Sequence, residues 1–184
     1  MKKLVLFAII LLTFAQLCGT AFAGNGDKAE ITFKYDRLSG HATNQFAIWV
    51  EDAEGKYVDT VYATRFTATG GWEKRPAALH RWVGHAEVAK MNKAEIDAIT
   101  GATPKAGTLT YTWDLTDKNG KKLPDGPYMI LLEATLRDEN SVVYRALVEV
   151  GGDSVTLHPI PKYAGKDEAD RKMISEVTVR YIGD

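Results

Sequence analysis

Cysteine is almost absent from this chain, which has one in 184 residues, Cys18. That cysteine lies in an N-terminal segment with the features of an export signal, so we expect none in the exported chain. A protein without thiols forms no disulfide, no thiolate metal site and no catalytic thiol. A c-type haem and an iron–sulfur cluster also need cysteine ligands. Electron transfer would therefore require a flavin, or a site built from His, Met or carboxylate groups.

The chain also lacks an apolar run long enough for a comfortable membrane span. Its longest run, Leu4–Leu17, follows two lysines and precedes the small-residue motif Ala21-Phe22-Ala23. A basic start, a short apolar stretch and a small-x-small motif are the three parts of a cleavable signal peptide. We expect residues 1–23 to be a signal peptide cleaved after Ala23, and the protein to be periplasmic.

An excess of either charge is lacking as well. The sequence has 23 Lys+Arg against 24 Asp+Glu, for a net charge of −1, and no basic tract stands out. This pattern argues against nucleic-acid binding, which requires a concentrated basic surface. Residues 24–184 form a chain of suitable length for a single domain with one sizeable core.

Apolar residues alternate with polar ones in several short segments, which is the pattern of half-buried strands. One segment, Gln45–Glu51, is apolar on both faces and is typical of a central strand. We place Trp49 and Trp113 in the core. We predict strands at Glu30–Tyr35, Gln45–Glu51, Tyr57–Ala63, Thr108–Leu115, Tyr128–Leu136, Val142–Val150, Val155–Ile160 and Val177–Tyr181. About eight short strands predict a mainly β protein, an immunoglobulin-like antiparallel β-sandwich.

The spacing of apolar residues changes from the period of two of a strand to that of a helix at about residues 73–98. Pro76 suits the first turn of a helix, and the pattern that begins there continues through Trp82. A second helical pattern runs up to Asp97. We therefore predict a short helical insertion within the sandwich.

The segment that follows this insertion, Asp97-Ala-Ile-Thr-Gly-Ala-Thr103-Pro104, resembles the acceptor signature of proteins that carry FMN on a threonine. That signature reads Asp-x-x-(Ser/Thr)-Gly-Ala-(Ser/Thr), and a flavin transferase joins the FMN phosphate to the hydroxyl of its last residue. The resemblance implies that Thr103 is the attachment point. It also implies that Asp97, Thr100, Gly101 and Ala102 complete the cofactor-binding motif.

The residues around Thr103 suit this chemistry, but they also suit a simpler role. A hydroxyl is a poor nucleophile unless it is exposed and accurately aimed. Gly101 and Ala102 remove bulk beside it, and Pro104 disfavours the helical region for the preceding residue. Gly101 and Pro104 are equally typical of the end of a helix (the punctuation interpretation), with the glycine closing the helix and the proline preventing its continuation. Both interpretations remain open.

Two wider resemblances concern the fold and the family. Residues 113–128, with a Gly turn and a Pro-x-Gly-x-Tyr corner, look like a hairpin of the immunoglobulin-like module of flagellar hook-capping proteins, which bears on fold alone. Nearly all of the mature chain is similar to the "predicted periplasmic protein" family known as domain of unknown function 2271. The segments that carry this likeness are Phe46–Asp52, Tyr62–Ala68, Gly70–Pro76, Asp97–Pro104 and the Trp113 hairpin.

That family has no established activity, and its members are discussed beside periplasmic flavin transferases and PepSY-type membrane proteins. The resemblance thus implies a redox setting, with covalent FMN as the cofactor and those two proteins as partners. Beyond Asp97–Thr103, the sequence has no flavin-binding domain like those of the respiratory flavin carriers. We expect an exported, flavinylated electron-transfer module. The alternative is a cofactor-free β-sandwich that binds a partner protein or a small ligand.

Three residues of the insertion form a further candidate site. The rings of Trp72 and Trp82 and the guanidinium of Arg75 can stack on a flat ligand. The alternative is that both tryptophans attach the insertion to the sandwich. Arg65 and Lys74 carry charges suited to a phosphate, or they are simply solvated.

Metal and hydrolase chemistry have little support in the sequence. His80 and His85 are five residues apart, which does not align them on one helix face, and no third ligand is evident. The sequence contains no Gly-x-Ser-x-Gly motif. We expect a protein without a metal and without catalytic residues, so that it is a carrier or a binding module and not an enzyme.

Overall fold

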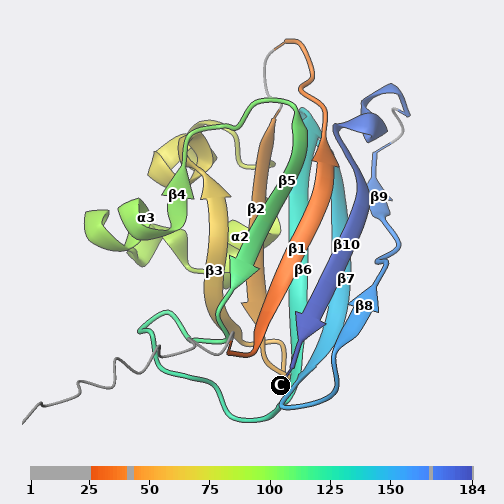
Figure 1. The fold of residues 1–184 in the computed structure, drawn as a ribbon. Helices are drawn as coiled ribbons and strands as arrows, with labels where there is room; N and C mark the ends of the chain where they lie inside the picture. The colour runs from red at the N-terminus through yellow and green to blue at the C-terminus, as the bar shows by residue number, and fades with distance from the viewer. Residues whose placement is uncertain (1–25, 41–43, 166–167, 184) are drawn as a thin grey trace, which may run out of the picture.

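The protein is a two-sheet β-sandwich in the computed structural model, which describes residues 26–40, 44–165 and 168–183 (Figure 1). The smaller sheet has the strand order β5-β1-β10-β8, and the larger sheet has the order β4-β3-β2-β6-β7-β9. The strands are β1 Lys28–Tyr35, β2 Gln45–Glu51, β3 Tyr57–Thr64, β4 Thr100–Gly101, β5 Gly107–Trp113, β6 Gly126–Arg137, β7 Asn140–Val150, β8 Val155–Leu157, β9 Lys162–Ala164 and β10 Ile174–Ile182. The predicted signal peptide lies outside the described residues.

The main core lies between the two sheets, where alternate residues of each strand meet. In β1, Ile31, Phe33 and Tyr35 point inward, as the period-two pattern predicts. The inward face of β6 from Tyr128 to Leu136 packs opposite them. Trp113 closes this core at one end of β5 and is almost fully buried. The prediction of a β-sandwich with these inward faces is confirmed.

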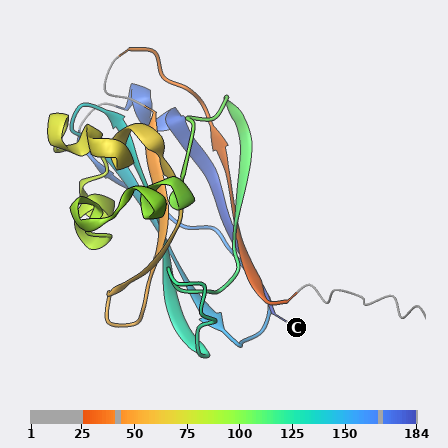
Figure 2. The same cartoon turned by 90° about the vertical axis from the view of Figure 1, so that its left-hand side faces the viewer.

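The larger sheet is buried on both faces around β2 and most of β6, where the helical insertion covers its outer side (Figure 2), whereas the outer face of β7 is exposed from Arg145 to Glu149. Every residue of β2 is buried, which explains why Gln45–Glu51 is apolar on both faces. Trp49 belongs to this second core and not to the one between the sheets. The insertion comprises η1 Thr67–Gly71, α1 Trp72–Lys74, α2 His80–His85, η2 Val88–Lys90 and α3 Lys93–Ile99. None of the described helices is long and apolar enough to span a membrane.

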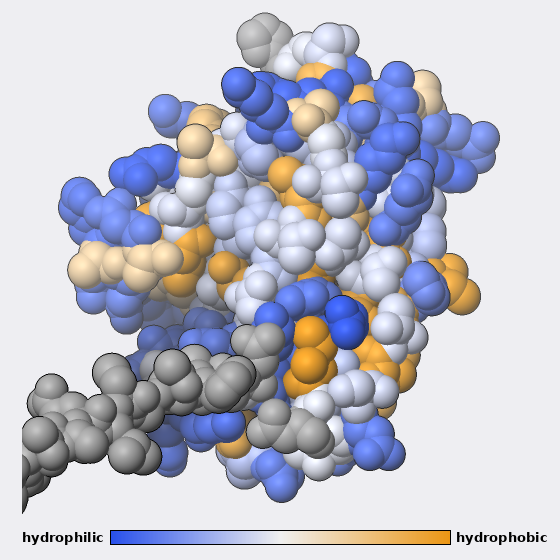
Figure 3. Space-filling view, viewed as in Figure 1, coloured by the Kyte–Doolittle hydropathy of each residue, from blue (hydrophilic) through white to orange (hydrophobic). Residues whose placement is uncertain are grey.

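The outer face of the smaller sheet is not covered in this way. In Figure 3, which has the viewpoint of Figure 1, this face shows mostly pale and blue residues with small, separate orange areas. Threonines make up much of it, and Thr32 on β1 and Thr110 on β5 share a hydrogen bond of 2.9 Å between their hydroxyls. Only one sheet therefore has a second hydrophobic layer.

Several details differ from the sequence-based expectations. The sandwich is not wholly antiparallel, because β4 pairs in parallel with β3 through Ala63↔Thr100 and Thr64↔Gly101. The strand predicted to reach Ile160 ends at Leu157, since two prolines follow and proline has no N–H to donate. The sequence patterns did not predict β4 and β9, which have two and three residues.

The expected hairpin at residues 113–128 is a crossing between the sheets. It joins β5 of the smaller sheet to β6 of the larger one, with an isolated bridge between Thr116 and Lys122. The helical region also begins earlier than predicted, at Thr67, and runs to Ile99. Alternation along a single strand cannot predict which sheet that strand joins, because both sheets bury one face in the same core.

Candidate functional site

The signature residues lie where α3 passes into the edge of the larger sheet. Asn92 caps α3, and its side chain accepts hydrogen bonds from the backbone N–H groups of Ala94 and Glu95. Glu95 completes the capping box by accepting from Asn92 N at 2.7 Å. The helix ends at Ile99, and the chain becomes extended at once, with φ −112° and ψ 146° at Thr100. A well-capped short helix therefore delivers the chain to β4.

Gly101 does not close the helix, which corrects the punctuation interpretation on this point. It belongs to β4, and its backbone does not adopt the left-handed conformation of a helix-closing glycine. Instead the glycine is needed for a close approach: a Cβ at this position would lie 2.7 Å from Cε2 of Tyr62. The edge strand can lie directly on the Tyr62 ring only because residue 101 has no side chain.

Tyr62 also holds the next residue of the signature. Its hydroxyl donates a hydrogen bond of 2.8 Å to the carbonyl of Ala102. The Tyr62 ring lies 4.5 Å from Tyr111 and 5.2 Å from Phe46 between centroids, so it is part of the aromatic core between the sheets. Burial raises the pKa of Tyr62. The hydroxyl therefore stays protonated and remains a donor to Ala102.

The two threonines of the signature lie in different surroundings. Thr100 is in β4, and its hydroxyl oxygen is buried with no hydrogen-bond partner among the described residues. Thr103 follows on the irregular segment between β4 and β5 and is half-buried beside the exposed Ala102. Within the described part of the chain, no hydrogen bond engages the Thr103 hydroxyl. Its oxygen is thus not committed to a structural contact.

Asp97 lies in the last turn of α3 and is bound by two cations. Arg65, just after β3, donates from Nη2 to Oδ1 of Asp97 at 3.1 Å, and Lys93 pairs with its other oxygen. The hydrogen bond from Lys93, followed by the charge of Arg65, lowers the pKa of the Asp97 carboxyl. Asp97 is ionised at neutral pH. The structure thus places Arg65, a candidate phosphate contact, beside the signature carboxylate.

The three proposed ligand-stacking residues do not lie on one surface. Trp82 is fully buried, and its Nε1 donates a hydrogen bond of 2.9 Å to Thr60 Oγ1 on β3. Trp72 is partly buried against the same second core. Arg75 extends over the ring of Phe66, 5.4 Å from its centroid. Of the three, Trp82 attaches the insertion to the sheet, as the second interpretation expects.

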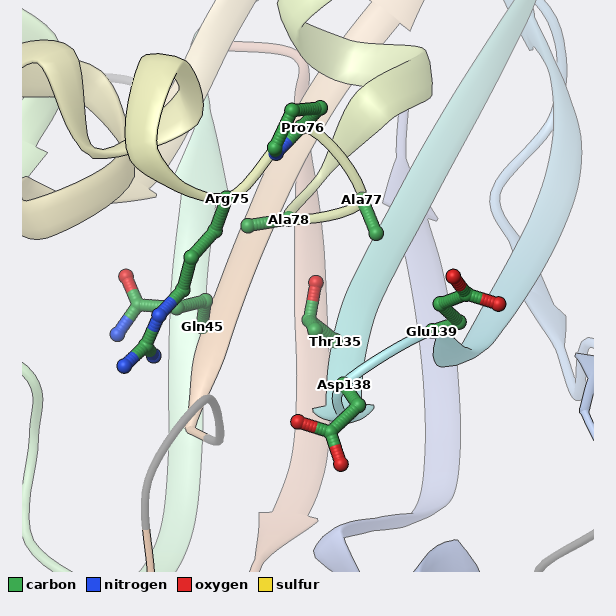
Figure 4. A pocket seen from close by; sticks show the side chains of 8 residues that line it. All are labelled: Gln45, Arg75, Pro76, Ala77, Ala78, Thr135, Asp138 and Glu139. Carbon is green, nitrogen blue, oxygen red and sulfur yellow. The ribbon is translucent and has the colours of Figure 1, made fainter.

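Arg75 lines a cavity of about 310 Å³ at the end of the larger sheet (Figure 4). Arg75 and Gln45 lie on one side of it, and Asp138 and Glu139 stand across from them on the turn between β6 and β7. Thr135 lies between the two sides and accepts a hydrogen bond of 3.0 Å from Leu79 N. This hollow has a cation facing two carboxylates, which suits a small polar ligand.

His80 and His85 contact separate carboxylates. Nδ1 of His80 lies 3.5 Å from Oε1 of Glu133, and Nδ1 of His85 lies 2.7 Å from Oε1 of Glu51. Glu51 also accepts a hydrogen bond of 2.8 Å from Trp49 Nε1. Among the described residues, no group of three His, Cys, Asp or Glu side chains could hold a metal ion. Both histidines connect the insertion to the larger sheet.

The structure also reveals one buried and one half-buried acid that the sequence patterns missed. Glu133 is fully buried on β6, and its carboxylate accepts from Trp82 N at 2.9 Å and from Arg81 N at 3.4 Å. Burial raises the pKa of Glu133. Asp59 lines a cavity of about 350 Å³ between β3 and α3, where burial raises its pKa to about 6. A charged residue in an alternating strand predicts a solvated face, so no sequence signal marked either acid.

Comparison with known proteins gives one family match. A family model described as "Predicted periplasmic protein (DUF2271)" matches residues 28–167. The match covers most of the sandwich, the whole insertion and the signature segment. Searches of curated proteins and of solved structures gave no significant match.

Proposed function

The chain belongs to the family of predicted periplasmic proteins known as domain of unknown function 2271. We propose that this member carries FMN covalently on Thr103 and transfers electrons outside the cytoplasm. The observation that carries the proposal is the placement of the signature. Its last threonine lies on an irregular surface segment, and Tyr62 holds the backbone just before it. Bound FMN supplies reversible electron transfer. The exported chain has no cysteine that could supply it instead.

The residues around Thr103 fit a phosphate-linked flavin in three respects. The Thr103 hydroxyl is uncommitted, and Thr100 offers a second, unpartnered hydroxyl within the same signature. Arg65 and Lys93 place two positive charges beside Asp97, the carboxylate of the same signature. Ala102 and Gly101 present no bulky side chain to an approaching enzyme. The fit concerns attachment of the phosphate and not enclosure of the ring system.

Attachment requires Thr103 to act as the nucleophile. Its Oγ forms a bond to phosphorus and gives up its proton to a base of the flavin transferase. The phosphoryl donor is then a flavin nucleotide activated as a pyrophosphate. Its P–O bond breaks, and a nucleoside monophosphate leaves with the bonding electrons. Asp97, kept ionised by Lys93 and Arg65, helps to position the acceptor segment or the transferase metal.

The proposed partners are those that the family resemblance implies. A periplasmic flavin transferase modifies the exported chain, and a PepSY-type membrane redox protein exchanges electrons with the product. Both partners require that the Thr103 segment is accessible after folding. Its position at the edge of the larger sheet, next to the exposed Ala102, meets that requirement.

The test is co-expression of the full chain with a periplasmic flavin transferase. We expect yellow protein whose flavin survives a denaturing gel, and a flavin phosphate adduct on the Thr103 peptide by mass spectrometry. Thr103→Ala removes the attacking oxygen and should abolish the adduct, whereas Thr103→Ser keeps a hydroxyl and should retain it. Asp97→Ala should slow the modification, and Thr100→Ala should affect it less.

Folding of each variant is checked by circular dichroism, and a known substrate of the transferase serves as the activity control. Colourless wild-type protein in the presence of an active transferase contradicts the proposal. Flavin on another residue would leave a redox role in place but reject Thr103 as the acceptor.

A cofactor-free binding module is the second candidate function. The cavity beside Arg75, with two acidic residues across from it, favours this alternative (Figure 4). Colourless protein together with ligand-dependent shifts in the amide resonances around Arg75 would favour it over the flavin carrier.

A further inference from the structure

A small cavity near the β9 edge of the larger sheet, the edge opposite β4 and the signature segment, is lined by four basic side chains. It has a volume of about 50 Å³ and lies between the start of α2 and the corner formed by β7 and β9. Its lining residues are His80, Arg81, Ser141, Val143, Arg145, Lys162, Tyr163 and Ala164. We infer that this cavity, defined here as the basic pocket, binds the phosphate or sulfate group of a small molecule.

The strand register brings the cations of β7 and β9 together. Val143 pairs with Lys162, and Ser141 pairs with Ala164, so these side chains share the outer face of the sheet. Arg145 is two residues beyond Val143 and therefore projects from the same face. Lys162 and Arg145 thus reach the same hollow from neighbouring strands.

The α2 side of the basic pocket is anchored to β6 of the larger sheet. Buried Glu133 on β6 accepts hydrogen bonds from the backbone N–H groups of Arg81 and Trp82. Trp82 itself is fully enclosed in the second core. The backbone that carries His80 and Arg81 is therefore fixed against the sheet before any ligand arrives, which lowers the entropic cost of binding.

Three of the four basic side chains of the basic pocket lack an ion pair among the described residues, whereas several arginines elsewhere have one. Arg65, Arg137 and Arg171 each form an ion pair with a carboxylate. In the described part of the chain, Arg81, Arg145 and Lys162 form no ion pair, and no carboxylate lines the pocket.

The exposed His80 contacts the buried Glu133, and the charge of Arg81 also acts on that carboxyl. Three permanent positive charges therefore face one carboxylate, which is itself hydrogen-bonded to the backbone. The local excess of positive charge favours an anion.

The size of the basic pocket limits the ligand. A single water needs roughly 10–15 Å³ of such space, so this cavity holds only a few atoms of that size. A tetrahedral oxyanion fits, whereas a sugar or a base must remain outside. Two guanidinium groups and an ammonium match the oxygens of phosphate or sulfate, and the Ser141 hydroxyl on the strand adds a neutral donor.

This site is separate from the signature segment. The larger sheet has β4 at one edge and β9 at the other, with four strands between them (Figure 1). A phosphate attached to Thr103 does not reach the basic pocket across that width, which is roughly 24 Å for five strand spacings. The inference therefore stands whether or not Thr103 carries a flavin.

The experiment is isothermal titration of the full exported chain with inorganic phosphate, sulfate and glycerol 3-phosphate at low ionic strength. We expect saturable binding, with shifted amide resonances at Arg81, Val143 and Lys162. Arg145→Gln and Lys162→Gln should each weaken binding about tenfold, because each removes one charge-assisted hydrogen bond. Lys56→Gln changes the net charge equally at an exposed turn away from the pocket and should leave the affinity unchanged.

Tighter binding of glycerol 3-phosphate than of phosphate assigns the site to a phosphorylated small molecule, and equal binding assigns it to the free anion. The inference is overturned if none of the three anions binds, or if Lys56→Gln weakens binding as much as the pocket variants do. Unchanged thermal unfolding of Arg145→Gln shows that any loss of affinity does not come from a loss of fold.

Discussion

Tyr62 shows how one side chain can connect the core to a surface site. Its ring packs between Phe46 and Tyr111 in the sandwich, and its hydroxyl binds the carbonyl of Ala102. Gly101 is required beneath the same ring because any Cβ there would overlap it. The position of the signature segment therefore depends on the packing of the two sheets, and a substitution at Gly101 would displace the segment that carries Thr103.

Asp59 supports a prediction about pH at the same scale. Burial raises its pKa from 3.8 to about 6, with nearby Asp114 and Asp117 adding to the effect. A raised carboxyl pKa favours the folded state below the pKa of the unfolded chain, and this contribution is lost as the pH rises through about 6. Asp59→Asn should therefore increase the free energy of unfolding at about pH 7, by about 1 kcal/mol after allowance for partial exposure, and change it little at about pH 4.

Urea unfolding of the variant and the wild type at both pH values measures this difference. Asp153→Asn, at an exposed loop position between β7 and β8, is the matched control. An Asp59→Asn variant that is less stable than the wild type at about pH 7 would contradict the prediction.

The helical insertion is the element that distinguishes this molecule from a bare sandwich. It covers the outer face of the larger sheet with a second core around Trp49, Leu79 and Trp82. Polar contacts with buried partners accompany this packing, at Thr60, Glu133 and Thr135. The insertion also ends in α3, so the same element that seals the sheet delivers the chain to Thr103.

Trp82 and Trp72 distinguish attachment of the insertion from ligand stacking. Trp82→Ala should reduce the free energy of unfolding by about 3–5 kcal/mol, because it empties a fully enclosed site. Trp82→Phe keeps most of the ring but loses the hydrogen bond to Thr60 and should cost about 1–3 kcal/mol. Trp72→Ala, at a half-buried position, should cost less than Trp82→Ala.

Denaturant unfolding followed by circular dichroism measures all three variants. If Trp82→Ala were no more destabilising than Trp72→Ala, Trp82 would not be the anchor of the insertion.

At the scale of the whole molecule, the two proposed sites lie at opposite edges of one sheet. The signature lies at the β4 edge and the basic pocket at the β9 edge, while the smaller sheet closes the core between them. Strands β2 and β6, which are largely buried on both faces, separate the two sites. A partner at one edge can therefore bind without displacing a ligand at the other.

Export is the prediction that concerns the whole chain. The basic start, the apolar run Leu4–Leu17 and the motif Ala21-Phe22-Ala23 predict a mature protein that begins at Gly24. The intact mass of protein isolated from the periplasm should match residues 24–184, increased by a flavin phosphate where Thr103 is modified. A mass that still includes residues 1–23 would exclude cleavage after Ala23.

The sequence by itself determined the properties that depend on local period and composition. Alternation predicted the inward faces of β1 and β6, and the double-sided apolar pattern of Gln45–Glu51 predicted a central strand. The change of period predicted the insertion. These features are local because side-chain direction along a strand or helix follows from the backbone repeat.

Only the tertiary structure decided which distant residues meet. Tyr62 lies under Gly101, 39 positions away in the chain. Arg81, Arg145 and Lys162 reach one pocket from three separate elements. Strands of two and three residues are too short to produce a period, and the register between strands depends on the packing of the whole sheet. The sequence could therefore mark Thr103 as a candidate acceptor, but not the ring that positions its segment or the cations at the opposite edge.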